Sequence, residues 1–205
     1  MKGYFEKFKV FLKNFKAEMS VAVSACKGNV IAFSHIYGKK EAFVWAFWFL
    51  FLPPIVNLLL TGFAFPSDFF KIFYSRYLFW PIFVPVIALI LSILAVAYFL
   101  EKVLHKHIDK KAFLAVFGYV SLSLWITMIS FVLMVLGFVD DYKVFELTFF
   151  AGALYMVYIM YVFLKEHFKL NKEEIVFCIL VGIIADAFTG SLLGRICIGS
   201  FYTWF

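Results

Sequence analysis

The chain has 205 residues, of which 65% are hydrophobic and only 16% are charged. Soluble domains average about 45–50% apolar and about 25% charged residues, and a small globule has too little interior to hide so much apolar surface. The composition therefore excludes an ordinary soluble domain and predicts a membrane protein. The formal charge of +6 does not indicate a nucleic-acid partner, because most lysines lie outside the apolar runs.

Residues 1–40 are predicted to form an amphipathic segment at the membrane surface. Apolar residues recur at spacings of three and four over 2–19, which indicates an amphipathic helix. Such a helix lies in the interface, with its rings at the acyl boundary and its ammonium groups at lipid phosphates. Residues 20–40 have mixed character and are expected to form a short interfacial helix or loop. Four lysines of the first helix are candidate contacts for anionic lipid: Lys7, Lys9, Lys13 and Lys16.

Residues 41–205 are predicted to form a transmembrane domain. A helix needs about 20 apolar residues to cross the hydrocarbon core of a bilayer. Five segments meet this requirement: 42–65, 78–100, 112–139, 144–164 and 175–193. The expected fold is therefore all-α, an integral membrane bundle of five transmembrane helices with an N-terminal amphipathic helix at the interface.

The distribution of lysine and arginine predicts the orientation of this bundle. Fifteen of the 19 Lys and Arg residues lie before the first span or in the second and fourth connections. Basic residues are retained on the cytoplasmic side, so we expect a cytoplasmic N-terminus and an outer C-terminus, in the inner membrane if the source is prokaryotic. Juxtamembrane lysines also attract anionic headgroups. The second connection supplies four such candidates: Lys102, Lys106, Lys110 and Lys111.

Asp186 is the most unusual residue of the predicted spans, because it lies near the middle of the last one. A charge at that depth costs about 2.5–3.5 kcal/mol on insertion scales. Gly182, Asp186, Gly190 and Gly194 recur every four residues and so share one side of a helix, where small residues allow a neighbouring helix to approach closely. Two interpretations remain open: a carboxyl group hydrogen-bonded to a neighbouring helix, or a contact for a transported ion, proton or substrate.

Pro53, Pro54 and Asn57 are expected to interrupt the first span. Broken helices line the binding sites of some transporters, but prolines are tolerated in many membrane helices. Both interpretations therefore remain for this segment.

Signatures of enzymes are missing from the sequence. It has no HExxH, GxSxG or P-loop motif, and its three cysteines lack the spacing of metal ligands or of a disulfide framework. We therefore predict no catalytic residue, cofactor or metal. A lipid-modifying enzyme would require three histidines of the cytoplasmic connections to converge: His105, His107 and His167.

Two stretches of the predicted transmembrane domain carry short motifs. The first consists of a lysine, a short apolar run, a Gly-Tyr pair and then a Ser-Leu pair: Lys111, residues 112–117, Gly118, Tyr119, Ser121 and Leu122. The second lies in and just after the fourth predicted span: Ala153, Leu154, Tyr155, Tyr158, Lys165, Glu166 and His167. They resemble the third and fourth helices of the Yip family, the Ypt/Rab-interacting multi-pass membrane proteins. Ser123 stands where that family often has a proline.

The resemblance implies a five-helix membrane fold over residues 42–193 and no catalytic residue. Eukaryotic Yip proteins bind Rab GTPases and one another and act in vesicle traffic and membrane shaping, and a prokaryotic-type member is expected here. The predicted function is non-enzymatic: contacts with lipids, with a membrane-protein partner or with a second copy, serving membrane organisation or trafficking. The alternatives are a small transporter or channel component that uses Asp186, and a membrane-embedded lipid-modifying enzyme.

Overall fold

The computed structural model describes residues 2–64, 79–125, 129, 132–133, 137–138 and 142–198. All regular elements within these ranges are helical, which confirms the all-α fold class. The elements are α1 (Lys2–Cys26), α2 (Val30–Gly38), α3 (Ala42–Ala64), α5 (Phe79–Lys102), α6 (Lys110–Val120), the 3-10 helix η2 (Ser121–Leu124), α8 (Tyr142–Phe168) and α9 (Lys172–Ile198).

Two of the described helices are long and apolar enough to cross a membrane. They contain the apolar stretches Phe83–Lys102 in α5 and Lys172–Gly194 in α9, and α3 contains a shorter one, Ala42–Val56. By length and composition these helices support an association with a membrane.

The helix α6 lies at the centre of the fold. Its residues from Ala112 to Val120 are buried with one exception, the half-buried Leu114, as is expected of a helix that is apolar on all sides. The long helix predicted over 112–139 is not continuous, because α6 ends at Val120 and η2 follows it. At this point the Ser121 hydroxyl donates a 2.6 Å hydrogen bond to the Gly118 carbonyl oxygen, and such local bonds compete with the regular helical pattern.

Gly118 allows α6 to cross α3 at very short range. A Cβ atom at this position would lie 2.4 Å from the Cβ and 2.7 Å from the Cα of Ala46. Any larger side chain would therefore push the two helices apart.

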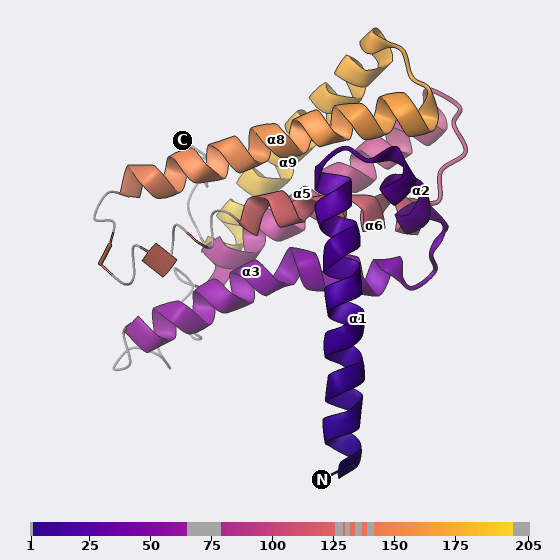
Figure 1. Cartoon of the computed structure of the whole chain (residues 1–205). Coiled ribbons are helices and arrows are strands. Elements are labelled where there is room, and N and C mark those ends of the chain that lie inside the picture. The colour runs from indigo at the N-terminus through magenta and orange to yellow at the C-terminus, as the bar shows by residue number, and fades with distance from the viewer. Residues whose placement is uncertain are drawn as a thin grey trace.

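The N-terminal segment packs into the bundle at one end and projects from it at the other (Figure 1). Its first helix extends beyond residue 19 to Cys26, and Ala22 and Ala25 are fully buried in the shared core. Gly28, with a φ of +74°, forms the turn into α2, where the Asn29 side chain accepts a hydrogen bond from the Ile31 N–H. Residues 20–40 thus form the end of α1 and a short helix.

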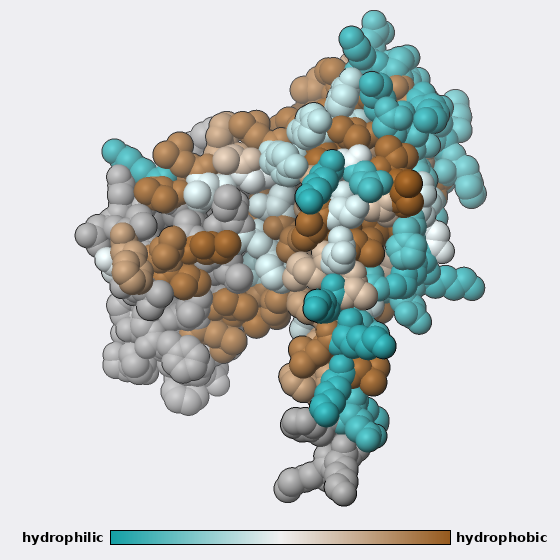
Figure 2. All heavy atoms as spheres, in the orientation of Figure 1, coloured by the Kyte–Doolittle hydropathy of each residue, from teal (hydrophilic) through white to brown (hydrophobic). Residues whose placement is uncertain are grey.

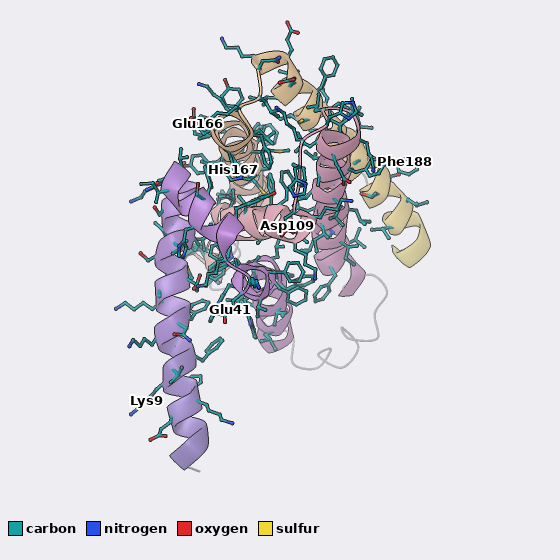
Figure 3. The ribbon with its side chains drawn as sticks, turned by 90° about the vertical axis from the view of Figure 1, so that its right-hand side faces the viewer. Lys9, Glu41, Asp109, Glu166, His167 and Phe188 are labelled. Carbon is teal, nitrogen blue, oxygen red and sulfur yellow. The ribbon has the colours of Figure 1, made fainter. Side chains whose placement is uncertain are left out.

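Two features of the overall shape bear on function. The helix α1 runs crosswise to α3 and α6 in both ribbon views (Figures 1 and 3). Hydrophilic residues gather at the end of the bundle where the 103–109 connection and the α8–α9 turn lie (Figure 2). The lysine-rich connections, far apart in the sequence, therefore share one end of the molecule.

Candidate functional site

The projecting part of α1 exposes both an apolar and a basic face. All of residues 6–14 are exposed, including Phe8 at 57% and Leu12 at 48%. The predicted lipid-binding lysines 7, 9, 13 and 16 are also exposed, and Lys9 points away from the bundle (Figure 3). An exposed amphipathic helix of this kind is suited to the boundary between headgroups and acyl chains.

The apolar face of α1 contacts the first turns of α3 through aromatic rings. The ring centroid of Phe11 lies 5.6 Å from that of Trp45 and 5.9 Å from that of Trp48, and Phe15 lies 6.1 Å from Trp45. These are favourable separations for aromatic pairs. The contact therefore holds the exposed part of α1 against the start of α3.

A buried polar cluster holds the base of α1. Glu18 is only 6% exposed, and its carboxylate forms an ion pair with Lys39, which follows α2. The Tyr119 hydroxyl of α6 donates a 2.5 Å hydrogen bond to the other carboxylate oxygen. Three segments are joined in this way, and each partner satisfies a group that would be costly to bury alone.

Sequence reasoning missed the role of Glu18, although a signal was present. Positions 11, 15, 18, 22 and 25 form one stripe at helical spacing, and Glu18 is the only charged residue in that otherwise apolar set. A carboxylate on the buried face of an amphipathic helix requires a partner.

The junction between α1 and α2 is also tied to α8. The Tyr155 hydroxyl donates a 2.7 Å hydrogen bond to the Cys26 carbonyl oxygen. The Cys26 thiol lies 3.6 Å from the Val120 carbonyl oxygen, and burial raises its pKa to about 11. The raised pKa keeps the thiol protonated at neutral pH, and the thiolate is the reactive form of cysteine. We therefore interpret Cys26 as a packing residue.

At the lysine-rich end, α2 meets the start of α6 and the end of α8. Asp109 caps α6, since its side chain accepts hydrogen bonds from the N–H groups of Lys111 and Ala112 at 2.9 and 3.2 Å. Its own N–H donates to the Tyr37 hydroxyl at 2.9 Å. The Tyr37 ring lies 4.5 Å from the His167 ring, and burial, followed by the charge of Lys169, lowers the pKa of His167.

The predicted lysines of the 103–109 connection and its flanking helix ends differ in their surroundings. Lys110 lies 2.8 Å and Lys102 3.5 Å from the carboxylate of Glu101, so part of their charge is neutralised. Lys111 is exposed and Lys106 is half-buried.

The histidines do not form a metal site in the described part of the chain. His105 and His107 are exposed, whereas His167 is half-buried beneath aromatic rings. Among the described residues no group of three or more His, Cys, Asp or Glu side chains is arranged to hold a metal ion.

The predicted stripe on α9 lies along α5. A Cβ at Gly182 would lie 3.2 Å from Val96 Cγ2 of α5, and Gly190 and Gly194 are buried. Asp186 is half-buried, and its carboxylate has no hydrogen bond or ion pair with the residues that the structure describes. The hydroxyl of Ser92 on α5 does not bind this carboxylate, because it donates a 2.8 Å hydrogen bond to the carbonyl oxygen of Leu89 in its own helix.

The two prolines of the first predicted span do not end its helix, contrary to the sequence prediction. Pro53 and Pro54 lie inside α3, which continues to Ala64. Proline at position 53 leaves the Phe49 carbonyl oxygen without its helical donor, and the Trp125 indole N–H donates to that oxygen at 3.1 Å. The side chain of Asn57 lies outside the described residues.

Comparison with protein-family models, with curated proteins and with solved structures finds no match to this chain.

Proposed function

We propose that this chain is a non-enzymatic, five-span integral membrane protein of the Yip type that binds the anionic cytoplasmic leaflet through α1 and organises the membrane there. The observation that carries the proposal is the geometry of α1. It is an exposed amphipathic helix, set crosswise to α3 and α6 (Figure 1) and held against the first turns of α3.

The apolar surface of the bundle supports its insertion in lipid. Phe177, Ile184 and Phe188 of α9 are each at least 60% exposed, and only 17% of the most apolar part of α9 is buried within the fold. A core helix of a soluble protein would be mostly buried, and large exposed apolar patches mark interfaces with lipid or partners. Lipid around α5, α8 and α9 removes the free-energy cost of exposing this apolar surface to water.

The shared lysine-rich end supports a cytoplasmic position for α1. Basic connections remain on the cytoplasmic side, and the anionic lipids of that leaflet attract lysines by about 1 kcal/mol each. The C-terminal end of α1 lies beside this lysine-rich end of the bundle. The helix α2 follows α1, leads into α3 and is hydrogen-bonded to the start of α6. Insertion of the apolar side chains of α1 into the bilayer and attraction of its lysines to anionic lipids then act on the same helix.

The residues that carry the Yip resemblance are in keeping with a structural role. Gly118 permits the α3–α6 crossing, Tyr119 binds Glu18, and Tyr155 binds the α1–α2 turn. Tyr119 and Tyr155 position the N-terminal segment and Gly118 positions α3 against α6, which supports a function through contacts rather than through catalysis.

Hydrogen–deuterium exchange of the full chain in nanodiscs tests the proposal. In discs with phosphatidylglycerol we expect the amides of 6–16 to be protected, and in pure phosphatidylcholine to exchange faster. Replacing lysines 7, 9, 13 and 16 with glutamine should abolish this difference, whereas replacement with arginine should preserve it. Equal exchange of the wild type in both lipids would overturn the proposal.

Transport through Asp186 is the second candidate function. It is supported by a half-buried carboxylate on a membrane-type helix without a partner among the described residues. Intramembrane acids commonly mark ion or proton pathways. A flux assay in proteoliposomes, comparing wild type with Asp186→Asn, distinguishes it, because the substitution should abolish transport but not the protection of α1.

A further inference from the structure

An apolar groove lies between α3, α5 and α6, on the side of α3 away from α1. It has a volume of about 220 Å³, and its lining is entirely apolar: Phe43, Ala46, Phe47, Leu50, Ile90 and Leu114. Cavities without polar groups do not hold ordered water. The occupant that this lining favours is therefore a hydrocarbon chain.

The groove begins at the lysine-rich end of the bundle. Lys40 lies in the turn that leads into α3, three residues before Phe43, and on α6, Lys111 lies three residues before Leu114. Lys111 shares a helix face with Leu114, since residues three apart on a helix are neighbours, and Lys40 immediately precedes the helix that carries Phe43, so both exposed lysines are placed near the mouth of the groove. The starts of α3 and α6 lie next to each other in Figure 3, near the labels of Glu41 and Asp109.

The charges at this mouth favour an anion. The segments that precede α3 and lead from α5 into α6 carry the basic residues Lys40, Lys102, Lys106, Lys110 and Lys111 and the acidic residues Glu41, Glu101 and Asp109. Two of the three carboxylates already have partners, since Glu101 pairs with Lys110 and Asp109 caps α6. Lys40 and Lys111 remain exposed to an incoming headgroup.

We propose that this groove binds one acyl chain of an anionic phospholipid whose headgroup lies at Lys40 and Lys111. The site rests on the membrane location proposed above and adds a bound lipid of defined class to it. The half-exposed ring of Phe47, at 53%, would cover the chain from the bilayer side. A lipid held here would bridge α3, α5 and α6.

Native mass spectrometry of the full chain tests the site after equilibration with equal amounts of phosphatidylglycerol and phosphatidylcholine in mild detergent. We expect one tightly retained phosphatidylglycerol per chain. Ile90→Phe should fill the groove and weaken retention about tenfold, a change of about 1.4 kcal/mol in binding free energy. Leu91→Phe, the same change at the exposed neighbouring position, should not weaken retention.

A charge variant keeps the test decisive if Ile90→Phe disturbs the fold. Lys40→Gln with Lys111→Gln should remove the preference for phosphatidylglycerol, whereas Lys172→Gln, at the exposed start of α9, should keep it. Equal retention of both lipids by the wild type would overturn the site. A retained second copy of the chain that Ile90→Phe dissociates would overturn it as well.

The exchange experiment on α1 separates the two proposals. Lipid-dependent protection of 6–16 together with unselective lipid retention refutes the groove site alone. Loss of both results refutes the membrane-surface function as well.

Discussion

The indole N–H of Trp125 donates a 3.1 Å hydrogen bond to the carbonyl oxygen of Phe49. In an unbroken helix that oxygen would accept from the N–H of residue 53, which is a proline here. The side chain of Trp125 thus replaces a missing backbone donor and fastens the end of η2 to the middle of α3. The two rings are also in contact, with centroids 6.2 Å apart.

Trp125→Phe should therefore destabilise the fold by about 1–3 kcal/mol, the cost of an unsatisfied buried acceptor. Unfolding in mixed micelles measures the change. Pro53→Ala provides a matched control, because alanine restores the backbone donor at position 53. In the Pro53→Ala background we expect Trp125→Phe to cost less, and equal costs in both backgrounds would refute the replacement.

Glu18→Ala should detach the base of α1. It leaves Lys39 and Tyr119 without their carboxylate partner, and breaking a buried pair costs about 3–5 kcal/mol. Hydrogen exchange should rise over residues 15–26, with little change in α9. Glu6→Ala, on the exposed part of α1, should change stability by less than about 0.5 kcal/mol. If both variants behave alike, the cluster does not anchor the helix.

Gly118→Ala should separate α3 from α6, since the new methyl group would lie 2.4 Å from the Ala46 Cβ. Overpacking of this kind typically costs about 1–3 kcal/mol. Thermal unfolding in detergent checks the loss, and Ala46→Gly in the same chain should recover part of it. Gly38→Ala is the control, because no atom lies within 4 Å of a Cβ at that position.

The stability of the lysine-rich end should fall in mild acid. Burial, and then the charge of Lys169, lowers the pKa of His167 in the folded state, so folding favours the neutral imidazole. Its contribution is complete above the unfolded value of about 6.5 and is lost as the pH falls through the lower folded value. Unfolding midpoints measured from pH 7.5 to 4.5 should show this loss, and His167→Phe should reduce it. The exposed His35 provides the control, and an unchanged profile in His167→Phe would contradict the assignment.

The local pattern of apolar residues predicted the positions of most helices. It did not predict contacts between residues that are distant in the sequence. The apolar runs place helices near the observed starts of α3, α5, α8 and α9. The polar partners are distant in the sequence: Tyr119 reaches Glu18 across 101 positions and Trp125 reaches Phe49 across 76. Periodicity marks Glu18 as a misplaced charge but does not identify its partner. The end of α6 at Val120 also depends on a local bond that an apolar run does not reveal.

Asp186 gives the test that best separates a structural acid from a transport site. Its carboxylate is half-buried and has no partner among the described residues, and a charge in the membrane costs about 2.5–3.5 kcal/mol on insertion scales. Asp186→Leu should therefore leave the amount of folded protein unchanged or raise it. The measurement is the monodisperse fraction recovered in mild detergent, with Ala187→Leu on the exposed side of the same helix as the control. If the Asp186→Leu variant selectively loses folded protein and the Asp186→Asn variant does not, the side chain is held instead by a hydrogen bond that asparagine can still make.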